Sequence, residues 1–192
     1  KNDIDYSLND NTQMPPDFYL NPDNKTEGLM EIKAFNYKGS PGFDIADFRM
    51  YEREIAQKPW MLNVTYLVFG YDMAEDGTVT IKKVWQKKVW EMSRPMKSGK
   101  SKTIWPINLQ IKQGTVHKMR PAKWYGKQTA FSIYDCLEDF LSAMEETMYK
   151  NKDTRDDAPD WLQKVLDNYE KHYGVRLQIS RWNDIASKYI NK

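Results

Sequence analysis

The sequence is poor in the residues that build disulfides, Cys/His metal centres and membrane-spanning helices. It contains one cysteine, Cys136, in 192 residues, so no internal disulfide can form. Its two histidines, His117 and His172, cannot complete a Cys/His zinc site with that single thiol. No stretch approaches the roughly 18 uninterrupted apolar residues of a membrane-spanning helix. We therefore expect a reducing, cytoplasmic compartment and no membrane partner.

The N-terminus lacks the features of a targeting segment. Lys-Asn-Asp-Ile-Asp has neither the basic region nor the apolar region of a signal peptide. Because the sequence begins without Met, we expect that an upstream segment has been removed. The length suits one domain over residues 1–192, with a core at about 15–128 and a helical part at about 129–192.

The charges are balanced in number but not in distribution. The 29 Lys and Arg residues against 27 Asp and Glu residues give a net charge of only +2. Residues 82–127, however, contain thirteen basic residues and a single acid, Glu91, a balance of +12 that leaves −10 for the remaining 146 residues. Solvated strand faces could explain such a run, but an asymmetry of this size favours a surface that binds a polyanion.

Two groups in this basic segment are candidates for contacts to DNA phosphates or guanine edges. The first group is Arg94, Lys97, Lys100 and Lys102, and the second, which extends one residue past the segment, is Lys123, Trp124, Lys127 and Gln128. Four tryptophans in the same segment could stack on unpaired bases, but their strand spacing is more typical of a core. They are Trp85, Trp90, Trp105 and Trp124.

The apolar pattern predicts an α/β fold with a mixed sheet. It indicates a short strand at 18–20, a buried strand at 29–35, a helix over 43–58 that Pro59 ends, and a central strand at 61–70. A strand, helix and strand in this order form a βαβ crossover, so we expect parallel pairing. Antiparallel strands follow at 79–81, 83–92 and 107–111, and three amphipathic stripes predict helices over 133–148, 161–169 and 182–190.

The predicted strand at 29–35 carries two charges that a core strand does not favour. Glu31 and Lys33 are two residues apart, so both side chains leave the same face, roughly 6.7 Å apart along the strand. Asp17 follows Pro15 and Pro16 at the head of the short neighbouring strand. Two carboxylates can hold Mg²⁺, and a lysine beside them can orient a water nucleophile or offset charge on a phosphate.

These residues resemble the PD-(D/E)XK nuclease superfamily, with Pro16-Asp17 followed by Glu31-Ile32-Lys33. In that superfamily the acid-x-Lys strand also precedes a helix and a parallel strand. The segments Glu31 to Tyr37 and Ser40 to Phe48 are similar to type II restriction endonucleases of the NgoBV group. The superfamily resemblance covers about residues 15–70.

The resemblance implies the fold, the activity and the roles of the site residues. It implies a restriction-endonuclease-like sheet with flanking helices, in which Asp17, Glu31 and the Ile32 carbonyl bind Mg²⁺ and Lys33 is the catalytic lysine. The expected activity is that of a type II restriction endonuclease, which hydrolyses double-stranded DNA at a short specific site. A palindromic site has two-fold symmetry, and with the resemblance this implies a homodimer.

Other functions remain open on the sequence. A structure-selective nuclease or nickase, of the resolvase or repair type, would use the same core, and a non-catalytic DNA-binding protein would need only the fold and the basic surface. Glu31 and Lys33 could also be a rim ion pair, with Asp17 as a turn cap.

Four smaller features have simpler interpretations. A second acid-x-Lys triplet, Asp23 to Lys25, lies in a turn-like Asn-Pro-Asp-Asn stretch. Asp44 and Asp47 are expected to cap the following helix, although they could approach the metal. His117 could touch phosphate, but we expect an exposed neutral imidazole. Cys136 is expected to be a small core residue.

Overall fold

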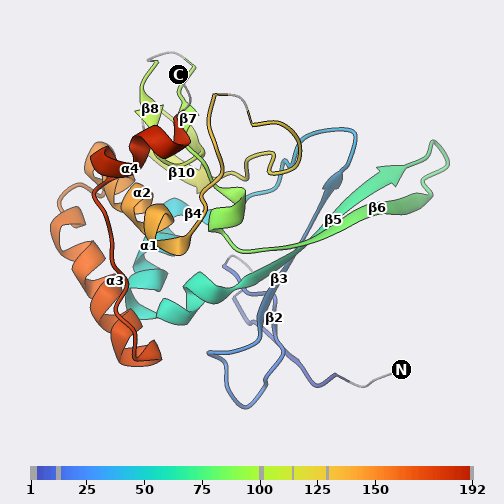
Figure 1. The fold of residues 1–192 in the computed structure, drawn as a ribbon. Helices are drawn as coiled ribbons and strands as arrows, with labels where there is room; N and C mark the ends of the chain where they lie inside the picture. Colours follow the sequence, from blue (N-terminus) through green and yellow to red (C-terminus); the bar gives the residue numbers. More distant parts are fainter. Residues whose placement is uncertain (1–3, 12–13, 100–101, 114, 129, 191–192) are drawn as a thin grey trace.

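Figure 1 shows the protein as a mixed sheet with its helices gathered on one side. This computed structural model describes residues 4–11, 14–99, 102–113, 115–128 and 130–190. A two-stranded arm projects from the sheet on the side away from the helices, and the N-terminal strands lie below it in this view. The fold class expected from the sequence is confirmed.

The main sheet has five strands in the order β1-β2-β3-β5-β6. They are β1 (Ser7–Leu8), β2 (Phe18–Tyr19), β3 (Leu29–Asn36), β5 (Thr65–Met73) and β6 (Val79–Lys87). Strands β3 and β5 pair in parallel from Met30 opposite Thr65 to Asn36 opposite Tyr71, whereas the other pairs are antiparallel. The parallel crossover predicted from the apolar pattern is therefore confirmed.

The crossover between β3 and β5 differs in detail from the expectation. Helix α1 (Phe48–Gln57) begins five residues later than predicted because Ala46–Asp47 form strand β4, which pairs with β10 (Thr115–Met119). After α1, Pro59–Asn63 form a 3-10 helix, so β5 begins at Thr65 and not at residue 61. The strand β4 ties the start of α1 to a second sheet, of order β4-β10-β9 with β9 at Leu109–Lys112.

The regular structure of the basic segment is mainly β, as its alternation predicts, and long loops join the strands. Residues 79–87 form one strand, and the expected continuation to Met92 ends in a 3-10 helix at Trp90–Met92. The carboxylate of Glu91 accepts the backbone N–H of Lys88 at 2.7 Å, which stabilises this turn. Short strands β7 (Met96–Lys97) and β8 (Ile104–Trp105) then form a separate hairpin.

The three C-terminal helices are those that the apolar stripes predict. They are α2 (Leu137–Lys150), α3 (Ala158–Tyr173) and α4 (Trp182–Tyr189). Pro159 lies in the first turn of α3, and Gly174 ends it with a φ of 69° that favours glycine. The indole of Trp161 donates to the Glu52 carbonyl at 2.8 Å and so joins α3 to α1. Within the described residues, no helix is both long and apolar enough to span a bilayer.

Candidate active site

Strand β3 places Glu31 and Lys33 on the face of the sheet that α1 covers. Their partners on β5 are Tyr66 and Val68, both fully buried. Tyr66 lies close enough to Tyr51 of α1 for the two phenols to interact, and burial raises the pKa of Tyr66 well above its usual value. Glu31 is therefore held between sheet and helix with only 4% of its surface exposed.

Asp17 is fixed beside β3 by a hydrogen bond to the main chain. Its Oδ2 accepts the backbone N–H of Ile32 at 2.7 Å. In the register that pairs Phe18 with Met30, the residue opposite Ile32 is Pro16, which has no N–H to donate to the Ile32 carbonyl. The ladder therefore stops at this point, and the Asp17 carboxylate takes the place of a backbone acceptor.

A direct ion pair joins the two charges of the Glu-x-Lys segment. The Lys33 Nζ lies 2.6 Å from Glu31 Oε1, while the buried Glu31 Oε2 has no hydrogen-bond partner among the described atoms. Burial raises the pKa of Glu31, the ion pair with Lys33 partly offsets that rise, and the charge of Asp17 adds to it. A buried oxygen without a partner is a position that a cation or a proton would stabilise.

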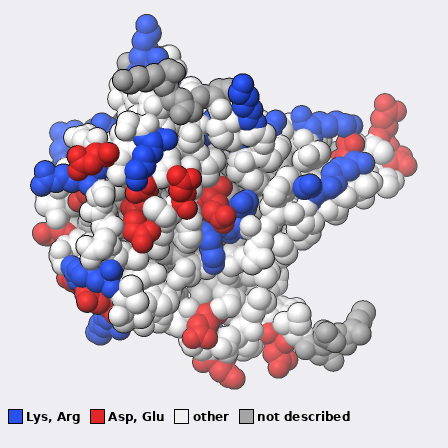
Figure 2. All heavy atoms as spheres, in the orientation of Figure 1, with Lys and Arg blue, Asp and Glu red and all other residues white. Residues whose placement is uncertain are grey.

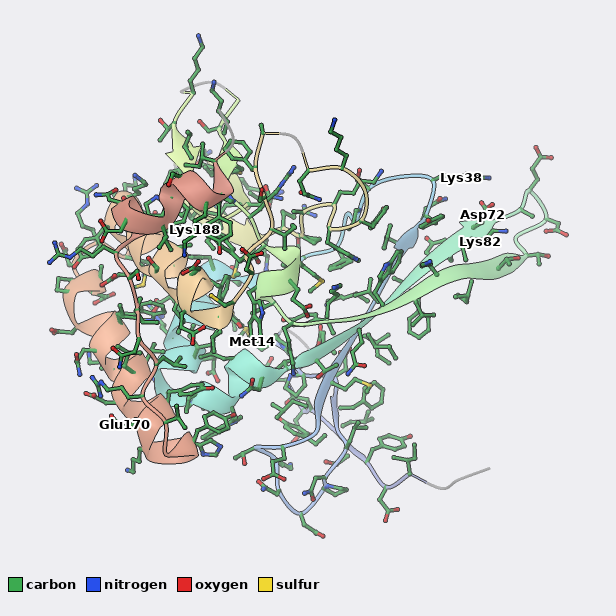
Figure 3. The ribbon with its side chains drawn as sticks, in the orientation of Figure 1. Met14, Lys38, Asp72, Lys82, Glu170 and Lys188 are labelled. Carbon is green, nitrogen blue, oxygen red and sulfur yellow. The ribbon has the colours of Figure 1, made fainter. Side chains whose placement is uncertain are left out.

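Glu31 and Lys33 line one wall of a pocket of about 130 Å³. The other walls come from the Met14-Pro15 turn, from Asp44 to Asp47 and from Lys118 of β10. Met14, labelled in Figure 3, lies in the middle of the molecule between the helices and the main sheet. The pocket is therefore a meeting point of the N-terminal turn, strand β3 and the second sheet.

The two acids before α1 have different roles in the structure. Asp47 caps the helix, because its Oδ1 accepts the backbone N–H of Met50 at 3.2 Å, as expected. The expectation that Asp44 caps the helix is wrong. Its Oδ1 lies 3.0 Å from the Nε of Arg120, because β4 comes between Asp44 and the helix start.

The donor set around Glu31 is one that suits a hard divalent cation. The described residues include no group of three or more His, Cys, Asp or Glu side chains that could hold a metal ion. Asp17 and Glu31 are two carboxylates on neighbouring strands, and the Ile32 carbonyl between them has no donor in Pro16. With the unpaired Glu31 Oε2, these oxygens fit Mg²⁺, which commonly binds one or two carboxylates and keeps several waters.

The candidate DNA contacts are distributed over the β7-β8 hairpin and the segment after β10. Lys97, Lys102, Lys123 and Lys127 are exposed, and Lys100 lies outside the described residues. Arg94 is half-buried, and its guanidinium donates to the Phe131 carbonyl at 3.4 Å. The side-chain amide of Gln128 donates to the Lys123 carbonyl at 3.0 Å and so braces this segment.

Figure 2 shows Lys and Arg side chains along the projecting arm and at the top of this face, with acidic side chains at the tip of the arm. The outer half of the arm carries an ion pair between Lys38 Nζ and Asp72 Oδ1 at 2.9 Å (Figure 3). The described basic residues of the segment 82–127 lie on several elements.

The tryptophans of the basic segment pack against the core, as their spacing favours. Trp85 is the centre of an aromatic cluster, with ring centroids 5.7 Å from Phe35, 5.5 Å from Trp124 and 5.1 Å from Tyr125. Phe35 follows Lys33 on the same face of β3. The cluster therefore fixes the segment that carries Lys123 and Lys127 to the strand that carries the site.

The remaining sequence features have mixed outcomes. The Asp23 to Lys25 triplet lies in a turn, where Asn21 Oδ1 accepts the Asn24 backbone N–H at 3.2 Å, as expected. His117 is half-exposed on β10. Cys136 is not a core residue. It is half-exposed at the N-cap of α2, because the buried stripe of that helix begins one residue later, at Leu137.

Sequence reasoning did not single out two basic residues that the structure brings to the site. Lys118 lines the pocket, and Arg120 pairs with Asp44 on its rim. Both belong to the basic segment, but only the pairing of β10 with β4 places them beside β3. The sequence does contain one indication of this pairing: Asp44 and Asp47 have the opposite charge to Arg120 and Lys118, with which they pair in the structure.

Similarity to known proteins defines the class of the molecule. The chain is 51% identical over 193 residues to the type II restriction enzyme NlaIV of Neisseria lactamica, an alignment that covers 100% of this chain and 77% of the relative. It is 44% identical over 113 residues to the type II restriction enzyme NgoBV of Neisseria gonorrhoeae, with 59% of this chain and 61% of that relative covered. The structure matches that of the NlaIV restriction endonuclease with a TM-score of 0.93, covering 98% of this chain and 75% of the other.

The fold and these relatives define a type II restriction enzyme, the class of site-specific deoxyribonucleases. Residues 1–189 match the model of the NgoBV restriction endonuclease family, and the chain belongs to that family. Enzymes of this class generally need a divalent metal ion. The family membership confirms the resemblance to the NgoBV group drawn from the segments Glu31 to Tyr37 and Ser40 to Phe48.

Proposed function

We propose that this protein is a Mg²⁺-dependent restriction endonuclease that hydrolyses phosphodiester bonds of double-stranded DNA at a short specific site. The observation that supports it best is the approach of Asp17, which directly precedes β2, to Glu31 and Lys33 on the neighbouring strand β3. One carboxylate oxygen of Glu31 is buried there without a partner among the described residues. The family membership supports the same activity.

In this proposal Asp17, Glu31 and the Ile32 carbonyl are the metal ligands. When bound there, Mg²⁺ would acidify a coordinated water and neutralise charge on the phosphate. The Asp17 carboxylate is oriented for this role by the Ile32 N–H, and the Glu31 carboxylate is oriented by the sheet and α1. A cation bound between the two carboxylates would offset the repulsion between their negative charges.

Lys33 is the proposed catalytic lysine. Without metal its ammonium is paired with Glu31 at 2.6 Å. When Glu31 binds a cation, the Lys33 ammonium is free to hold the attacking water through a hydrogen bond and to offset charge that develops on the phosphate oxygens. Attack by the water oxygen forms the new P–O bond as the P–O bond to the sugar oxygen breaks. The attacking water loses a proton to solvent, and the departing sugar oxygen takes one from solvent.

The DNA-contacting residues are proposed to be Arg94, Lys97, Lys100, Lys102, Lys123, Lys127 and Gln128. The exposed lysines among those described suit phosphate contacts, whereas Arg94 and Gln128 hold main-chain carbonyls and are better placed to shape the surface. We propose a homodimer, since the two-fold symmetry of a palindromic site presents equivalent phosphates, one on each strand, to two protomers. A single cysteine fits a cytoplasmic enzyme.

Incubation of the purified protein with plasmid DNA tests the proposal. We expect discrete fragments in Mg²⁺ and none when EDTA is in excess. Intact plasmids over many sequences, from protein that is folded by circular dichroism, would refute the activity. Cleavage of branched DNA regardless of sequence would instead identify a structure-selective nuclease, and salt-sensitive binding without cleavage would identify a binding protein.

A further inference from the structure

Lys118 enters the same pocket as Glu31 and Lys33, but from a different sheet. It lies on β10, which pairs with β4 so that Lys118 is opposite Asp47. Its flanking apolar neighbours on the strand, Val116 and Met119, are buried in the core, which fixes the main chain at this position. The pocket therefore has a lysine on two of its walls.

The local partner of Lys118 holds it only loosely. The Lys118 Nζ lies 3.7 Å from Asp47 Oδ2, which is longer than the roughly 2.7–3.2 Å of a direct hydrogen bond. The Asp47 carboxylate itself is fixed, because its other oxygen caps α1 at Met50. The Lys118 side chain is 36% exposed. It can therefore turn toward a ligand in the pocket while the Asp47 carboxylate stays in place.

The pocket has room for a phosphate oxygen and its solvent. Its volume of about 130 Å³ equals that of roughly four water molecules at about 30 Å³ each. Before a metal binds, the ammonium of Lys33 is held by Glu31 in a 2.6 Å ion pair, whereas Lys118 has only the 3.7 Å contact with Asp47. A nonbridging oxygen that enters the pocket can therefore be met by Lys118, which lines the same pocket.

We propose that Lys118 is a further substrate-binding residue of this active site, which contacts a nonbridging oxygen of the DNA phosphate in the pocket. The inference rests on the proposed nuclease function. Lys118 holds the phosphate against the β3 wall, and Asp47 keeps the ammonium pointed into the pocket before DNA arrives. Its charge also offsets the negative charge that the phosphate brings beside Asp44 and Asp47.

Single-turnover cleavage at saturating enzyme tests this role, because it reports events after DNA binding. We expect Lys118→Ala to slow cleavage by roughly 10- to 100-fold and Lys118→Arg to restore much of the rate, since the charge is kept. Lys112→Ala is the matched control. Lys112 is an exposed lysine of the same small sheet that does not line the pocket, and we expect its cleavage rate to be unchanged.

A second measurement separates contact with DNA from a structural role. Binding of the cognate duplex in EDTA should show a salt dependence whose slope is smaller by about one phosphate contact in Lys118→Ala than in the wild type. Asp47→Asn keeps a helix-capping oxygen but frees the ammonium. We expect it to tighten binding more in the wild-type background than in Lys118→Ala, where only the repulsion between Asp47 and the phosphate is relieved.

Each outcome has one interpretation. If the wild type cleaves and Lys118→Ala, folded by circular dichroism, cleaves at the same rate, the role of Lys118 is refuted while the nuclease function stands. If Asp47→Asn abolishes cleavage, Asp47 acts on the metal or the substrate itself, and its role as the partner that orients Lys118 is refuted. If the wild type does not cleave at all, it is the proposed function that fails.

Discussion

Two substitutions of Asp17 separate a metal ligand from a turn cap. In the wild type the Ile32 N–H donates to Asp17 Oδ2 at 2.7 Å. Asp17→Asn removes the negative charge but keeps a side-chain oxygen that can accept this N–H. Asp17→Ala removes both the charge and the acceptor. A residue that only closes the end of the sheet would tolerate Asn, whereas a residue that binds Mg²⁺ would not.

The expected sizes of the two effects differ. A hydrogen bond to a charged group contributes about 1.5–3 kcal/mol, and this one is exposed to solvent, so we expect Asp17→Ala to lower the free energy of unfolding by about 1 kcal/mol. Asp17→Asn should change it by less than about 0.5 kcal/mol. Both variants should cleave at least about 100-fold more slowly, a loss of roughly 2.7 kcal/mol of transition-state stabilisation.

Urea unfolding and plasmid cleavage in Mg²⁺, both on the same preparations, measure these two quantities. Raising the Mg²⁺ concentration should recover part of the activity of Asp17→Asn, because one ligand is weakened and not the whole site. An Asp17→Asn variant that cleaves at the wild-type rate would show that the Asp17 charge has no part in the chemistry. Asp17 would then be a structural cap.

Three further predictions follow from the same structure. Glu31→Gln should abolish cleavage without lowering the thermal unfolding midpoint at pH 8. Burial raises the pKa of the Glu31 carboxyl, so the folded protein bears a cost for its charge that the neutral amide does not. A large fall in the midpoint would contradict this. Burial raises the pKa of Glu52 from 4.5 to about 7, so between these pH values the folded protein binds more protons than the unfolded chain. The free energy of unfolding should therefore fall as the pH rises from about 4.5 to 7, by at most about 3 kcal/mol. Urea unfolding of Glu52→Gln should lack that dependence, and an unchanged profile would exclude Glu52 as its source. Gly70→Ala should destabilise the protein by about 1–3 kcal/mol in the same assay, because a Cβ there would lie 2.9 Å from Trp85 and 3.0 Å from Tyr37, and a neutral result would show that the rings can shift.

The sequence predicts the β3-α1-β5 crossover well because its signals are local. The apolar run at Leu29 to Phe35, the β-branched run before Gly70 and the stop at Pro59 each depend on adjacent residues. The same local pattern places Glu31 and Lys33 on one face of a strand. Their ion pair at 2.6 Å is a direct consequence of that spacing.

The second sheet was not predictable in the same way. Strand β4 has two residues, and its partner β10 is about 70 residues further along the chain. Such pairing depends on tertiary packing that no short pattern records. For this reason the late start of α1, the Asp44–Arg120 ion pair and the approach of Lys118 to the pocket were found only in the structure.

The half-exposed position of Cys136 has a similar origin. Its neighbours Tyr134 and Leu137 are buried, so a helical stripe through them would include the thiol. The helix begins only at Leu137, and Cys136 is extended at the N-cap with a φ of −146°. An error of a few residues in a helix start thus changes which face a side chain occupies.

A comparison of Lys33→Ala with the wild type tests the central claim most directly. Cleavage of a plasmid in Mg²⁺ and binding of the same duplex in EDTA would be measured on both proteins. We predict that Lys33→Ala loses cleavage while its dissociation constant stays within a few-fold of the wild-type value. Wild-type cleavage by the folded variant would contradict the assignment of the catalytic site to Asp17, Glu31 and Lys33.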